Sequence, residues 1–215
     1  MRATDATNTE TMFRIIQSIP SPKAEPFKAW LAQVGYERIQ EIEDPELAAE
    51  RARQYYRDLG YDEAWIGTRI KSIGVRGELT DEWKRRDVRE GLEFSILTAE
   101  ISKATFGMTP TDYKAFKDLG KENLRDHMTN LELIFTMLGE ESTRQQAIAQ
   151  DARGLDENRD AAQKGGHSTG KAREAFEQES GRKVSTPENF KGQIAEAKKQ
   201  KGKVLKDKPD DPDAP

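Results

Sequence analysis

The sequence predicts a mostly α-helical protein: an irregular helical domain followed by loosely packed helices and a disordered C-terminal tail. Apolar residues recur every three or four positions through most of the chain up to Glu140, and no alternating strand pattern of useful length occurs. All three tryptophans and all five tyrosines precede Lys114, so the core is expected there. Hydrophobic and charged residues each make up 34% of the 215 residues, and the mean hydropathy is −0.90. This composition predicts that part of the chain contributes little to a core.

Two short helices are expected first. Residues 12–19 form an apolar run that Pro20 must end, because proline cannot continue a helix. A second helix begins close to Pro26. Its apolar residues are Phe27, Trp30, Leu31 and Val34.

The next helix has clear start and stop signals. Asp44 can cap its first turn, Pro45 suits the first helical position, and Gly60 can adopt the left-handed conformation that closes a helix. The apolar stripe between these signals consists of Ala48, Ala52, Tyr55, Tyr56 and Leu59.

Two further helices follow. Asp62 opens a run whose apolar face extends to Gly74, although residues 70–79 hold enough branched side chains for a short extended piece. Helical spacing resumes over residues 94–104, and Gly107 stops it.

Residues 101–117 have the layout of a helix-turn-helix: a helix, a glycine turn, and a second helix that Thr109 and Pro110 begin. Lys103 occupies a first-helix position where a small residue is usual, and an ordinary helical hairpin shares the pattern, so both interpretations stay open. The side chains expected to pack between the helices are Phe106, Met108, Tyr113 and Phe116. The candidates for contact with DNA or a partner are Thr111, Lys114, Lys117, Lys121 and Arg125.

The firmest helix prediction is the one that starts at a capping box between Thr129 and Glu132, ahead of the apolar run 131–138. From Glu141 to Pro215 the hydrophobic side chains number 18, and ten of these are alanine, so this part can form helices but bury little. The predicted organisation is closing helices of a truncated N-terminal domain over 1–42, a helical core domain over 43–140, a loosely packed helical extension over 141–197 and a disordered charged tail over 198–215.

Few residues can carry catalysis. The chain has no cysteine and two histidines, which excludes thiolate metal sites and cysteine nucleophiles. Asp126 could orient His127 as a base, but neighbours on a helix point about 100° apart. We therefore expect a structural turn that ties down the following capping box. Acidic residues are spread over helix faces that we expect to be solvated, so we assign no catalytic residue, no cofactor and no metal site.

The glycine-rich segment 165–171 superficially resembles a phosphate-binding loop because it ends in Gly170 and Lys171. It lacks the four-residue spacing, the hydroxyl residue after the lysine and a preceding apolar strand. A flexible loop between helices is the better interpretation.

The net charge of the chain does not indicate one class of binding partner. From Glu141 to Pro215 the chain holds 15 basic and 14 acidic side chains, a net charge of +1. The whole chain carries −4, so the part before Glu141 carries −5. This balance fits protein binding better than non-specific DNA binding. No apolar run approaches the roughly 20 residues that span a bilayer, and the N-terminus lacks the apolar core of a signal peptide. We expect a cytoplasmic protein without membrane contact.

Two stretches resemble known families. The first, residues 12–39, contains Phe13-Arg14-Ile15-Ile16, Ser18, Pro22-Lys23-Ala24, Phe27-Lys28 and Trp30-Leu31. It is similar to the final helices of the BRO-type N-terminal domain of phage antirepressors. The resemblance implies that most of that domain is absent here. Apolar side chains that would pack against the absent part then predict an exposed patch or self-association through residues 12–34.

The second stretch covers residues 79–190. Its motifs are Thr80-Asp81-Glu82-Trp83, Ile96-Leu97-Thr98, Glu100-Ile101, Gly107-Met108-Thr109, Tyr113-Lys114, the block Lys121 to Thr129 with Leu124-Arg125-Asp126-His127-Met128, Glu132-Leu133 and Gly181-Arg182-Lys183-Val184. It resembles the prophage antirepressor C-terminal region shared with the DNA-damage-inducible protein D family.

The resemblance implies a prophage or bacterial regulatory protein linked to the DNA-damage response. Such an antirepressor-like protein would act by binding a repressor, a DNA-repair protein or DNA. The resemblance implies no enzymatic activity and marks no binding residue. Two other hypotheses stay open: a carboxylate-based nuclease that uses magnesium, and a degenerate fragment without independent function.

Overall fold

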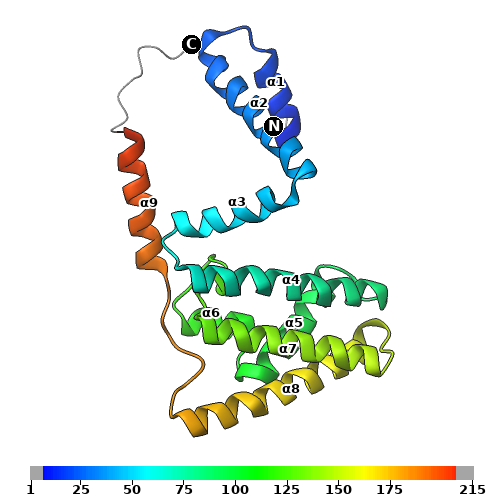
Figure 1. The fold of residues 1–215 in the computed structure, drawn as a ribbon. Helices are drawn as coiled ribbons and strands as arrows, with labels where there is room; N and C mark the ends of the chain where they lie inside the picture. The colour runs from blue at the N-terminus through cyan, green and yellow to red at the C-terminus, as the bar shows by residue number, and fades with distance from the viewer. Residues whose placement is uncertain (1–6, 207–215) are drawn as a thin grey trace, which may run out of the picture. The chain divides into compact units, whose positions relative to one another are not determined.

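The computed structural model describes residues 7–206, and the side chains of residues 7–200. The chain divides into two compact units, residues 1–52 and residues 53–215 (Figure 1). Over the described range the backbone forms nine α-helices, two short 3-10 helices and no strand, which confirms the mostly α fold class. The alternative prediction of a short extended piece at residues 70–79 is wrong, because these residues lie inside one continuous helix.

The first unit is built entirely from helices over its described residues. They are α1 (Thr9–Ser18), the 3-10 helix η1 (Pro22–Ala24), α2 (Glu25–Glu43) and the first part of α3 (Pro45–Asp58). Asn8 caps α1 by accepting a hydrogen bond from the Thr11 amide at 2.8 Å, and α1 ends at Ser18, just before Pro20. The rings of Phe13 in α1 and Phe27 in α2 lie 5.8 Å apart. The two predicted helices are therefore present, and aromatic side chains hold them together.

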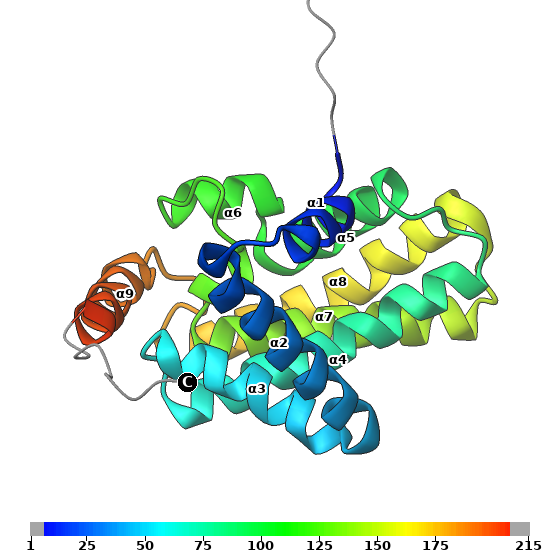
Figure 2. The same ribbon diagram turned by 90° about the horizontal axis from the view of Figure 1, so that it is seen from above.

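The second unit contains the remaining helices. They are α4 (Glu63–Arg85), α5 (Leu92–Phe106), α6 (Pro110–Phe116), the 3-10 helix η2 (Leu124–His127), α7 (Asn130–Ala149), α8 (Gly154–Ser180) and α9 (Lys191–Lys206). α7 packs against α4, α5 and α8, and α8 also packs against α5 (Figures 1 and 2). The predicted start of α7 is confirmed, since Thr129 and Glu132 form both hydrogen bonds of a capping box.

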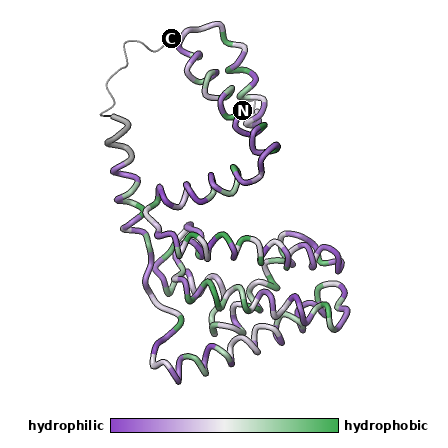
Figure 3. The backbone as a smooth tube through the Cα atoms, viewed as in Figure 1, coloured by the Kyte–Doolittle hydropathy of each residue, from purple (hydrophilic) through white to green (hydrophobic). Residues whose placement is uncertain are grey.

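The hydrophobic core lies in the second unit. Figure 3 shows hydrophobic and hydrophilic residues alternating along α4 and α7, as expected for helices with one face in a core. One cluster surrounds Trp65 and includes Tyr61, whose ring stacks on Trp65 at 3.8 Å between centroids. A second cluster surrounds Trp83. The Trp65 indole N–H donates to the Met128 carbonyl at 2.8 Å, which joins α4 to the start of α7.

The structure differs from the predicted loose extension in α8. The segment 165–171, predicted as a flexible loop, lies within this helix, and its glycines face neighbouring backbone. A Cβ atom on Gly165 would lie 2.4 Å from the Thr143 nitrogen in α7, and one on Gly170 would lie 2.5 Å from the Ala104 oxygen in α5. Small residues let α8 approach both helices closely, so a shortage of large apolar side chains does not mean loose packing here.

The predicted boundaries also differ from the observed units. The first unit ends at residue 52, inside α3, rather than at residue 42. The boundary predicted at 140 falls within α7. Of the tail predicted over 198–215, residues 198–206 continue α9, and residues 207–215 lie outside the described residues.

Candidate functional site

The segment expected to resemble a helix-turn-helix has the predicted layout. α5 ends at Gly107, whose φ of 75° is left-handed, and Thr109 and Asp112 form a capping box at the start of α6. The rings of Phe106 and Tyr113 lie 5.2 Å apart, so the two helices pack as expected. Phe116 differs, because its side chain is exposed.

The five candidate residues do not form one exposed basic face. Thr111 and Lys121 are exposed, and Lys114 and Arg125 are half-buried. Lys117, which the helix-turn-helix interpretation exposes, is fully buried at 0%. The expectation of an exposed Lys117 is therefore wrong, and the reason is an internal ion pair.

The Lys117 ammonium is enclosed by partners. It lies 2.9 Å from the Glu132 carboxylate of α7, which is also completely buried, and it donates to the carbonyls of Thr186 and Glu188. Tyr113 donates to the same carboxylate at 2.7 Å. These contacts satisfy both buried charges and fasten the segment before α9 to α6 and α7.

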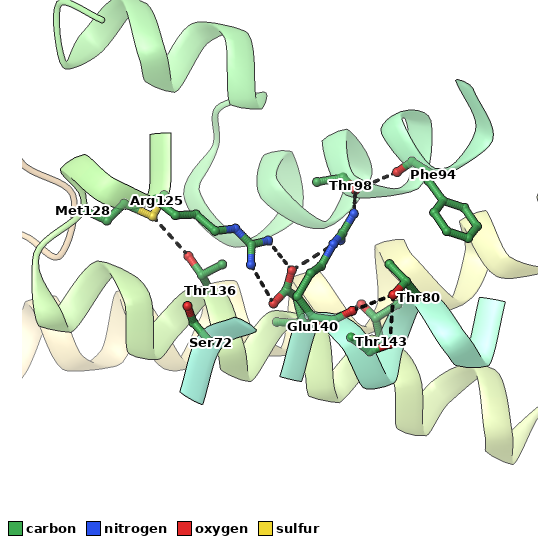
Figure 4. Close-up of polar contacts among 12 residues, drawn as sticks. Ser72, Thr80, Phe94, Thr98, Arg125, Met128, Thr136, Glu140 and Thr143 are labelled. Atoms are coloured by element: carbon green, nitrogen blue, oxygen red, sulfur yellow. Dashed lines mark hydrogen bonds and ion pairs between the residues drawn. The ribbon is translucent and has the colours of Figure 1, made fainter. Parts of the chain in front are cut away.

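A second buried carboxylate lies nearby in α7. The Glu140 side chain is 2% exposed and is bound by two guanidinium groups, Arg125 from η2 and Arg76 from α4 (Figure 4). Arg76 also donates to Thr98 of α5 at 2.7 Å. Burial lowers the pKa of the Arg76 guanidinium, although the Glu140 charge opposes this shift. One carboxylate with two guanidinium groups leaves a net positive charge at this place.

A cavity of about 360 Å³ lies beside this cluster. Its walls come from α5, the start of α6, η2 and α7. Three of the five candidate residues line it, namely Lys114, Lys121 and Arg125. Its apolar walls are Ile101, Phe106, Pro110, Leu124 and Met128. A cavity of this size, with a mostly apolar surface and a few polar groups, is typical of small-molecule sites.

Asp126 and His127 make separate contacts. The Asp126 carboxylate accepts a hydrogen bond from Arg69 at 2.8 Å, and the His127 Nδ1 atom accepts one from the Phe190 amide at 3.1 Å. Both side chains hold distant parts of the second unit together. These are long-range contacts, whereas the sequence predicted contacts with the neighbouring capping box.

His127 makes folding sensitive to pH. Burial lowers its pKa below 6.5, against the opposing charge of Asp126. At a pH between the pKa of His127 in the folded chain and its higher pKa in the unfolded chain, the unfolded chain binds more protons. The free energy of unfolding should therefore fall as the pH drops from 7.5 through 6.5. Thermal melts at pH 7.5 and 6.0 should show this loss. His127→Asn, which keeps an acceptor for the Phe190 amide, should reduce it, and an NMR titration placing the His127 pKa above 6.5 would contradict this assignment.

The sequence interpretation missed the two buried glutamates, because it placed acidic residues on solvated faces. Glu132 and Glu140 lie on the buried face of α7 with Leu133, Gly139 and Thr143. The sequence does contain a signal for their burial, because both glutamates lie within that apolar stripe, two helical turns apart. Charged residues in such a stripe are expected to be buried and to need partners.

No protein-family model and no curated protein sequence matches the chain. Among the described residues, no three acidic, histidine or cysteine side chains gather so that they could hold a metal ion. None of the helices in this part of the chain is both long and apolar enough to cross a membrane.

Proposed function

We propose that this chain is a non-enzymatic, antirepressor-like regulatory protein that acts by binding another protein, a repressor or a DNA-repair protein, through its N-terminal helices. The observation that carries the proposal is the exposure of apolar side chains in the first unit. Among residues 7–52, Glu41 is the one buried side chain, and no apolar side chain is buried.

The exposed side chains form stripes. Met12 and Ile15 share one face of α1, since they are three positions apart, and the exposed Ile19 follows directly after the helix. On α2, Trp30 and Val34 lie four positions apart on one face and are 51% and 41% exposed. Contiguous apolar surface of this kind marks an interaction site on a folded domain.

The first unit buries too little to be stable by its own core. Its aromatic contacts join Phe13, Phe27 and Trp30, and all three side chains keep solvent contact. In units below about 70 residues a single core rarely supplies more than a few kcal/mol, and many natural examples add a stabilising element such as a disulfide, a metal or a partner. A protein partner that covers the apolar stripes of α1 and α2 would supply the missing burial.

Charge favours a protein over DNA as the partner. Of the five residues considered for DNA contact, Lys117 is enclosed and Arg125 is committed to Glu140. The two lysines that are left, the half-buried Lys114 and the exposed Lys121, offer few phosphate contacts. Affinity for DNA rises with the number of neutralised phosphates, so such a surface would bind it weakly. The two stretches similar to phage antirepressors support the same regulatory class.

Expression in a bacterium that carries a prophage, with a reporter behind a repressor-controlled prophage promoter, tests this function. The wild-type chain should raise reporter expression. Ile15→Glu with Trp30→Glu should abolish the rise, because a buried, unpaired carboxylate at an interface is strongly unfavourable. Leu92→Glu, which changes an exposed leucine of the second unit, should retain it. An equal response to all variants, or none to the wild type, would refute the proposal.

Two solution measurements distinguish the other partners. Light scattering should report a monomer. A dimer that Trp30→Glu dissociates would mean that a second copy covers the stripes instead. A gel shift with random duplex DNA should show no complex at low salt, and a salt-sensitive complex would replace the protein partner with DNA.

A further inference from the structure

The cavity between α5, η2 and α7 has free cationic groups at its edge. Neither the Lys114 nor the Lys121 ammonium has an ion-pair or hydrogen-bond partner among the described side chains. Lys117, on the next turn after Lys114, is by contrast enclosed by the Glu132 carboxylate and two backbone carbonyls. The two cavity lysines are thus available to an anion.

The acidic side chains of the cavity already have partners. Glu140 is held by Arg125 and Arg76, as described above. Hydrogen bonds from its own backbone amide and from the Gly120 amide, the latter at 2.6 Å, lower the pKa of the Glu122 carboxyl, and the Lys191 ammonium lies 3.7 Å from this carboxylate. These carboxylates therefore do not compete strongly for the Lys114 and Lys121 ammonium groups.

Three of the four hydroxyl groups that line the cavity have used their protons. Thr98 donates to the Phe94 carbonyl, Ser102 to the Met108 carbonyl and Thr136 to the Glu132 carbonyl. They can still accept hydrogen bonds but do not donate into the cavity. The fourth hydroxyl, on Thr105, has no hydrogen-bond partner among the described residues, so the donors left for a ligand are this group, the Asn123 amide and the cationic side chains.

We propose that this cavity binds a small amphipathic anion, a molecule with an apolar body and one carboxylate, sulfonate or phosphate group. The apolar body lies against Ile101, Phe106 and Met128, and the anionic group lies at the edge beside Lys114 and Lys121. The volume of about 360 Å³ falls at the lower end of the range for ligand sites, which sets the size of one or two rings or a short chain.

A ligand in this cavity would contact several helices at once and could therefore stabilise the second unit. Arg125 lines the cavity and binds Glu140 of α7, so an occupant contacts side chains of α5, η2 and α7 together. Binding to the folded state alone stabilises it in proportion to the logarithm of ligand concentration. The occupant is therefore expected to raise the melting temperature of the second unit.

Two fluorescent probes that differ by one charge test the proposal on the full chain. Anilinonaphthalene sulfonate carries an apolar ring system and one anionic group, and phenylnaphthylamine has the same rings without the charge. We expect the sulfonate to bind the wild type more tightly. Lys114→Gln with Lys121→Gln should weaken it by about tenfold, or roughly threefold for each lysine. Affinity for the uncharged probe should stay within about twofold.

Lys103→Gln is the matched control, because Lys103 is an exposed lysine of α5 outside the cavity. It should bind the sulfonate as the wild type does. Amide NMR shifts should locate the probe at Ser102, Leu124 and Met128. Equal affinity of the double variant and the wild type, shifts confined to residues 9–43, or no binding of the sulfonate would each overturn the proposal.

Discussion

Lys117→Met should lower the free energy of unfolding by about 3–5 kcal/mol, because it removes one partner of a buried ion pair. Lys117 and Glu132 are both fully buried, and their charged groups lie 2.9 Å apart. Without the ammonium, the Glu132 carboxylate keeps its hydrogen bonds from Tyr113 and the Thr186 amide but loses its counter-charge. The Thr186 and Glu188 carbonyls lose their donor as well.

Urea unfolding followed by circular dichroism measures this loss. The control Lys103→Met changes an exposed lysine and should alter stability by less than about 0.5 kcal/mol. Adding Glu132→Gln to Lys117→Met removes the uncompensated charge and should recover at least about 1 kcal/mol. A cost below about 1 kcal/mol for Lys117→Met would mean that the pair is not enclosed as described.

Gly165→Ala should destabilise the second unit by about 2 kcal/mol or more, although alanine favours a helix over glycine by about 1 kcal/mol. The added Cβ would lie 2.4 Å from the Thr143 nitrogen and 2.6 Å from its Cα atom, which are backbone atoms of α7. Backbone cannot rotate away as the end of a flexible side chain can. α7 and α8 must therefore separate, and their other contacts weaken.

Gly74→Ala is the opposite case. Gly74 lies within α4, and a Cβ atom there would meet nothing within 4 Å. This substitution should stabilise the protein by about 0.5–1 kcal/mol through helix propensity alone. The two variants carry the same chemical change, so a difference in sign between their urea midpoints isolates the close approach of α8. Two stabilising substitutions would show that α8 does not lie against Thr143.

Local sequence signals predict most helix ends. Gly60 and Gly107 have φ values of 85° and 75°, the left-handed conformation expected where a glycine ends a helix. Thr129 and Glu132 make the capping box that their spacing indicates. These features involve residues close together in the chain, so the sequence specifies them without distant contacts.

Glycines inside helices lead to wrong predictions of helix ends from the same local signals. Gly74 predicts a helix end and Gly165 a loop, yet both lie inside continuous helices. Propensity disfavours glycine by about 1 kcal/mol in a helix, and tertiary packing exceeds that cost. At Gly165 the compensation is the close contact with α7.

The sequence by itself determined the helical class, the capped helix starts, the aromatic core before Lys114 and the set of charged residues near α6. Only the tertiary structure decided which of these charges meet solvent. Lys114 and Lys117 lie one helical turn apart and are equivalent by sequence pattern, but one lines a cavity and the other is enclosed by Glu132. The partner carboxylate comes from another helix, α7, and the carbonyls come from Thr186 and Glu188. Helical periodicity describes one helix at a time, whereas the environment of a charge depends on every element that packs around it.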